Sequence, residues 1–209
     1  RRTEKEDRKA IVAIPITILV ALAVTLAASQ GGATVLGIPL FALAVGLVFL
    51  IQWLAFVVAY LLQTESFYDL TGSLTYISVI TMAVLLSPVI DRRSVVLLVL
   101  VVVWATRLGT FLFLRIQKTG KDARFDELKV SFVRFLNTWT LQGLWVTLTL
   151  AAAMVAITTT ERQGLGLFAL IGVLVWALGF AIEVTADMQK SRFRADPDND
   201  GRFIQTGIW

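Results

Sequence analysis

The sequence predicts an all-α integral membrane protein with six transmembrane helices and with both termini on the cytoplasmic side. Of its 209 residues, 57% are hydrophobic and 16% are charged, whereas a soluble domain is about 25% charged. The apolar residues lie in long stretches, and a helix needs about 20 of them to cross the bilayer core. Lys and Arg are also distributed unevenly among the segments that connect these stretches.

Six apolar stretches approach or exceed this length, and polar or turn-forming residues separate them. We expect transmembrane helices at residues 10–29, 35–62, 70–87, 95–116, 140–159 and 165–184. The second stretch is long enough to span the bilayer with a tilt. We expect residues 117–139 to form a cytoplasmic or interfacial segment and residues 185–209 to form a cytoplasmic segment. The whole chain is then a single membrane domain.

The basic residues predict the orientation of these helices. With six spans and a cytoplasmic N-terminus, fifteen Lys and Arg residues fall on the cytoplasmic side and three fall on the other side. Cytoplasmic loops of membrane proteins carry such an excess. The asymmetry therefore supports six spans, and it predicts a multi-pass membrane protein, located in the cell membrane if the source is a prokaryote.

Composition excludes several classes of chemistry. The chain has no His and no Cys, which excludes disulfides, Cys/His zinc sites, thiol catalysis and Ser-His relays within these residues. It also lacks the glycine-rich motifs of soluble nucleotide-binding folds. We therefore expect no metal and no nucleic-acid partner. The net charge of +4 fits loop topology and anionic headgroups, and we expect the partners to be the lipid bilayer and a hydrophobic small molecule.

Charged residues at membrane depth are candidates for function. Arg107 lies within the fourth predicted span, where an Arg costs at least about 2.5 kcal/mol on insertion scales. It is either a structural ion-pair partner or an anion or substrate contact. Glu183, Asp187, Lys190 and Arg194 follow one another at intervals of four, three and four residues, which places them on one helical face. Glu183 lies near membrane depth, so we expect Arg107 to pair with a carboxylate, with Glu183 favoured over Asp187.

Two further segments allow both a structural and a functional interpretation. Asp69 could cap the third predicted helix, which residue preferences alone favour. Together with Tyr68 it could instead donate a proton to a substrate carbonyl. The basic and aromatic residues of 117–139 indicate either an amphipathic helix on anionic lipid or a rim for a phosphate-bearing cofactor.

Several short strings resemble one known family. They are FYDLTGS at 67–73, WATRLG at 104–109 with RI at 115–116, DARF at 122–125, QG at 142–143, EVTADMQK at 183–190 and GIW at 207–209. In order and spacing they resemble the steroid 5-alpha-reductase superfamily, specifically its bacterial-type branch of unknown function. In this family, an Arg-His-Pro-type motif and a further membrane helix follow the Gly-x-Trp string. We therefore expect these features to complete the fold and the cofactor site.

The resemblance implies an NADPH-dependent reductase that acts on an activated, enone-type double bond of a lipid or steroid-like substrate. It implies that Asp187 and Arg194 bind NADPH, that Glu183 belongs to the same site, and that Arg107, Arg115 and Arg124 are further candidates for its phosphates. Tyr68 and Asp69 are then the candidate catalytic residues at the carbonyl end. Two alternatives remain: an isoprenylcysteine-type membrane methyltransferase, and a membrane subunit that retains the fold without catalysis.

Overall fold

The computed structural model describes residues 2–120 and 122–209. It is 77% helical, and its described part contains six helices that are long and apolar enough to cross a membrane. The predicted all-α class with six candidate spans is thereby confirmed, while the side of the membrane on which the termini lie stays a prediction. The chain forms two compact units, residues 1–162 and 163–209, which are described separately below.

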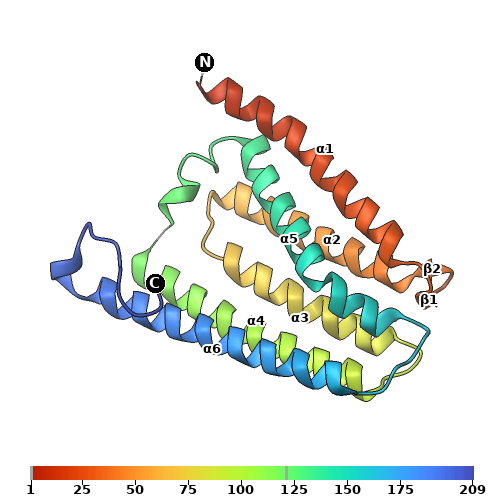
Figure 1. The fold of residues 1–209 in the computed structure, drawn as a ribbon. Helices are drawn as coiled ribbons and strands as arrows, with labels where there is room; N and C mark the ends of the chain where they lie inside the picture. The colour runs from red at the N-terminus through yellow and green to blue at the C-terminus, as the bar shows by residue number, and fades with distance from the viewer. Residues whose placement is uncertain (1, 121) are drawn as a thin grey trace. The chain divides into compact units, whose positions relative to one another are not determined.

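The first unit contains five long helices (Figure 1). They are α1 (Arg2–Ala28), α2 (Leu40–Leu62), α3 (Tyr68–Leu86), α4 (Arg92–Thr119) and α5 (Phe132–Thr158). A small hairpin of β1 (Thr34–Val35) and β2 (Ile38–Pro39) joins α1 to α2, and a short 3-10 helix, η1 (Ala123–Phe125), lies between α4 and α5. The second unit contains α6 (Leu167–Ala195) and η2 (Pro197–Asn199).

Local sequence signals explain where several helices begin and end. The carboxylate of Asp91 accepts a hydrogen bond from the Ser94 N–H at 2.8 Å and so caps the start of α4. Gly120, with a φ of 79°, ends α4, because a left-handed backbone is strained for other residues. The hydroxyl of Ser131 accepts a hydrogen bond from the Arg134 N–H and caps α5.

The helices differ most from the predicted spans at three places. α1 begins at Arg2, before the expected residue 10, and α5 begins at Phe132, before the expected residue 140. α6 continues to Ala195, well beyond residue 184. A 27-residue helix such as α5 is about 40 Å long, which exceeds the roughly 30 Å of a bilayer core. Hydropathy detects only the part of a helix that lies in hydrocarbon. Among the described residues of 117–139, no single amphipathic helix covers the segment, because α4 ends at Thr119 and α5 begins only at Phe132.

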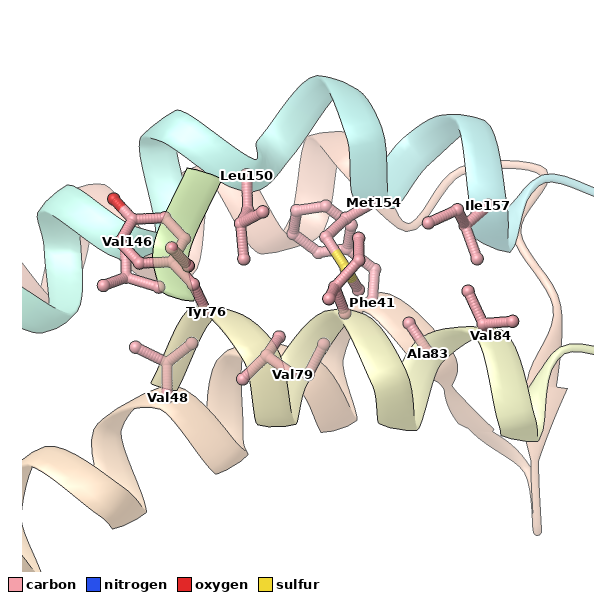
Figure 2. Close-up of a cluster of buried hydrophobic side chains, with 13 residues drawn as sticks. Phe41, Val48, Tyr76, Val79, Ala83, Val84, Val146, Leu150, Met154 and Ile157 are labelled. Atoms are coloured by element: carbon pink, nitrogen blue, oxygen red, sulfur yellow. The ribbon is translucent and has the colours of Figure 1, made fainter. Parts of the chain in front are cut away.

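The core of the first unit lies mainly where α2, α3 and α5 meet (Figure 2). Phe41 from α2, Val79 from α3 and Leu150 from α5 belong to one buried cluster. Gly143 on α5 lies against the ring of Phe49, and a Cβ at this position would come within 3.0 Å of it. Small residues at such points allow transmembrane helices to approach closely.

The connections bring distant segments together at both ends of this unit. At one end, the Ala33 N–H donates to the Thr158 carbonyl at 2.7 Å, and Arg162 pairs with Asp91 at 3.5 Å. At the other end, Arg134 of α5 pairs with Asp7 of α1 at 2.9 Å. The α2–α3 turn, the end of α4 and the start of α5 also meet at this second end, which carries four of the five candidate residues of this unit.

Candidate functional site

The α2–α3 turn places Tyr68 and Asp69 at the start of α3. Gln63 adopts a left-handed conformation with a φ of 50° and ends α2, and the Tyr68 N–H donates to the Glu65 carbonyl at 2.9 Å. The N-cap of α3 is Phe67, and no side chain makes a capping hydrogen bond there. The capping interpretation of Asp69 is therefore wrong. Its carboxylate lies in the first turn of α3 and is available for other contacts.

Tyr68 is held in one orientation. Its ring packs edge-on against Phe125 and against Trp139, with centroid distances of 5.0 Å in both cases. Its hydroxyl donates a hydrogen bond to the backbone carbonyl of Thr138 at 3.1 Å. The phenol can donate its proton to a substrate only after this hydrogen bond is exchanged. The carbonyl belongs to α5, so the fold itself sets the position of the phenolic oxygen.

Asp69 meets one of the arginines that were predicted to bind a cofactor. The Nη2 of Arg115, near the end of α4, lies 3.5 Å from the Oδ2 of Asp69. Both side chains are partly exposed, at 34% for Arg115 and 22% for Asp69. The structure therefore brings together two candidates that lie 46 positions apart in the sequence.

Arg124 lies on the loop between α4 and α5 and forms a forked pair with Asp122. The Nε of Arg124 donates to both carboxylate oxygens at 2.9 Å. This hydrogen bonding lowers the pKa of Asp122, and the charge of Arg115 lowers that pKa further. The same pairing raises the pKa of Arg124. Arg115 thus pairs with Asp69 and also lowers the pKa of Asp122, the carboxylate that pairs with Arg124.

Sequence reasoning assigned no individual role to three residues of this region, Glu65, Lys129 and Gln142. Glu65 is a buried carboxylate that pairs with Lys129 at 2.5 Å. Gln142 of α5 donates to the Tyr68 carbonyl at 3.3 Å. A Cβ at position 72 would come within 2.7 Å of its Nε2, so the end of the Gln142 side chain would have to move. No local pattern marks these contacts, because each joins segments that lie more than 60 positions apart.

Arg107 precedes Arg115 on α4 and lies in an open groove of about 540 Å³. The groove is lined by Val102, Val103, Thr106, Arg107, Thr110, Phe111 and Leu114. The guanidinium of Arg107 lies over the ring of Phe111, 5.2 Å from its centroid. The last lining residue, Leu114, directly precedes Arg115, so the groove ends at the helical turn that contributes the partner of Asp69.

In the second unit, α6 contributes Glu183, Asp187 and Arg194. The C-terminal segment folds back on this helix: the indole N–H of Trp209 donates to the Ala186 carbonyl at 3.0 Å. Lys190 lies over the ring of Trp209 at 4.4 Å. The predicted ion pair between Arg107 and Glu183 would join the two units and stays a prediction.

Comparison with known proteins points to one family. A family model described as a protein of unknown function (DUF1295) matches residues 55–209. That family contains steroid 5-alpha-reductase-like proteins in general. The matched stretch includes all the candidate catalytic and cofactor-binding residues. Searches of curated proteins and of solved structures gave no match.

Proposed function

We propose a reductase function on the premise that this chain belongs to the DUF1295 family, a family that contains steroid 5-alpha-reductase-like proteins. The proposed reaction is the NADPH-dependent reduction of an activated, enone-type double bond in a lipid or steroid-like substrate. The observation that carries the proposal is the meeting of Tyr68, Asp69, Arg115 and Arg124 around the start of α3. They combine a proton donor with cations in one region at the edge of the membrane span.

The charges of this region fit a phosphate-bearing cofactor. Guanidinium groups bind phosphate through paired N–H donors, and the side chain of Arg124 is 72% exposed. Arg115 and Arg124 would contact the phosphates, and NADPH when bound supplies a hydride to the substrate carbon. By the family resemblance, Asp187 would accept a hydrogen bond from a ribose hydroxyl or an amide, and Arg194 would bind a phosphate. Glu183 and Arg107 belong to the same proposed set.

The apolar lining of the groove along α4 is consistent with a hydrophobic substrate. Ligand sites are mostly apolar and contain few polar groups, and the open face of α4 around Arg107 has this character. Its end at Leu114 would direct a substrate carbonyl toward the turn that carries Arg115. Because negative charge develops on the carbonyl oxygen during hydride addition, a proton donor lowers the barrier. We assign this role to the phenol of Tyr68 or to Asp69 in its protonated form.

Cofactor binding to the full chain in lipid nanodiscs tests the proposal. NADPH is expected to raise the thermal unfolding temperature, and Arg124→Ala is expected to weaken NADPH binding about tenfold or more, because charge-assisted hydrogen bonds are lost. Arg92→Ala, an exposed arginine at the opposite end of the unit, is the matched control and should bind as the parent does. Stabilisation by S-adenosylmethionine would instead indicate a methyltransferase. Stabilisation by neither compound would indicate a non-catalytic subunit.

A further inference from the structure

A buried carboxylate next to the candidate site has no role in the function proposed above. The side chain of Glu65, in the α2–α3 turn, is only 4% exposed. Both of its oxygens are used by one segment: Oε1 accepts the backbone N–H of Asp122 at 3.1 Å, and Oε2 contacts the Nζ of Lys129 at 2.5 Å. Burial of a carboxylate is unfavourable unless it is paired and hydrogen-bonded, and here a single loop supplies both partners.

Residues 122–129, here called the strap, are folded between these two contacts. The Phe125 N–H donates to the Asp122 carbonyl at 3.0 Å, and the Lys129 N–H donates to the Phe125 carbonyl at 3.0 Å. The strap is therefore tied to Glu65 at its first and at its last residue. Midway between these ties, Phe125 is buried, with 5% of its surface exposed, and its ring packs against Tyr68.

We propose that Glu65 is a positioning residue of the candidate site and that its ion pair with Lys129 anchors the strap over Tyr68. Phe125 and Trp139 both pack edge-on against the phenol ring. Trp139 belongs to the long helix α5, whereas the position of Phe125 depends on the strap. The strap also carries the pair of Arg124 with Asp122, so the anchor places a candidate phosphate ligand as well. The inference rests on the proposed function only where it concerns turnover.

The anchor itself can be tested without any enzymatic assay. Hydrogen–deuterium exchange is measured on the full chain in nanodiscs, comparing the parent with Glu65→Gln and Lys129→Met. Each variant is expected to speed amide exchange in residues 122–129 by about tenfold to a hundredfold, because a charge-assisted interaction is lost. The double variant should exchange no faster than the single variants, since both remove the same contact. Lys129→Arg, which keeps the cation, should retain most of the protection.

Asp126→Asn is the matched control for the removal of an acid near the same lysine. Its carboxylate lies 3.6 Å from the Nζ of Lys129 and is 41% exposed, so its loss should change strap exchange by less than twofold. If Glu65→Gln leaves exchange of the strap unchanged, the anchor inference is overturned. The same holds if the effects of Glu65→Gln and Lys129→Met simply add, because the two side chains then act independently.

Turnover separates this inference from the proposed function. In single-turnover hydride transfer with saturating NADPH, Glu65→Gln is expected to lower the rate at least tenfold. The single variant Lys129→Arg keeps the cation and should transfer hydride at a rate near that of the parent. Faster strap exchange with an unchanged rate would overturn the positioning role. A parent protein that transfers no hydride would overturn the proposed function, and the exchange measurements would then decide on the anchor alone.

Discussion

Replacing Tyr68 by Phe removes a single oxygen atom and tests the proton-donor assignment. The ring keeps its contacts with Phe125 and Trp139, so no cavity forms. The lost interaction is the hydrogen bond to the Thr138 carbonyl at 3.1 Å. Such a bond contributes about 0.5–1.5 kcal/mol to stability. The carbonyl lies within α5, where the helix itself supplies a donor partner, so we expect a cost at the lower end of this range.

The effect on turnover should be far larger than the effect on stability. General acid catalysis contributes about 10²- to 10⁴-fold to a rate, and proton donation is needed only as charge develops on the carbonyl oxygen. We therefore expect Tyr68→Phe to lower single-turnover hydride transfer by at least a hundredfold, while NADPH affinity and thermal stability change little. Tyr60→Phe is the control, because Tyr60 packs against Phe56 and Phe132 and has no role in the proposed reaction.

The assay is stopped-flow absorbance of NADPH oxidation with saturating cofactor and an enone substrate presented in nanodiscs. A rate within twofold of the parent would refute Tyr68 as the proton donor, and Asp69→Asn would then be the variant expected to lose activity. An equal loss of rate in Tyr60→Phe would show that the effect is structural.

Three other outcomes are expected, two from the geometry and one from the family resemblance. Gly72→Ala should lower the free energy of unfolding by about 1 kcal/mol, because its Cβ would come within 2.7 Å of Gln142 and displace the hydrogen bond of this side chain to the Tyr68 carbonyl. Gly46→Ala, with no atom within 4 Å, should not lower it in the same denaturation assay, because alanine favours the helix. The hydrogen bond from the Ser94 N–H lowers the pKa of Asp91. The contribution of ionised Asp91 to folding stability is therefore present above its unfolded-state pKa and is lost as the pH falls through the lower folded-state pKa. The melting temperature should drop in this acidic range, and it should drop less in Asp91→Asn. Asp187→Ala should weaken NADPH binding about tenfold to a hundredfold in a titration, and unchanged affinity would remove this residue from the proposed cofactor site.

The membrane helices could be predicted because their signal is local. A stretch such as 95–116 identifies α4 by apolar content alone, since insertion depends on the transfer of consecutive side chains into hydrocarbon. The same reasoning missed the first eight residues of α5, which begin at Phe132. Their Arg, Asn and Thr side chains lower hydropathy but do not interrupt backbone hydrogen bonding. The β1–β2 hairpin also escaped prediction, because two residues in each strand leave no periodic pattern.

The candidate site could be predicted only in part. Tyr68 and Asp69 are neighbours in the sequence, and a phenol beside a carboxyl group indicates acid chemistry by residue type alone. The pairing of Asp69 with Arg115 could not be inferred, because it depends on how α3 packs against α4. Glu65 gave no signal at all. Its role depends on Lys129, 64 positions away, and on a loop that the sequence suggested as part of an amphipathic helix.

The sequence alone determined the class of molecule: a helical membrane protein with six candidate spans and without histidine or cysteine chemistry. These properties depend on composition and on the length of apolar stretches, which are additive along the chain. Tertiary structure decided which charges meet. An ion pair between distant residues forms only where packing brings the two groups within a few ångströms of each other, and it persists under burial only where hydrogen bonds replace the lost water. For Glu65 and Lys129, the close packing of the α2–α3 turn against the loop before α5 meets both conditions.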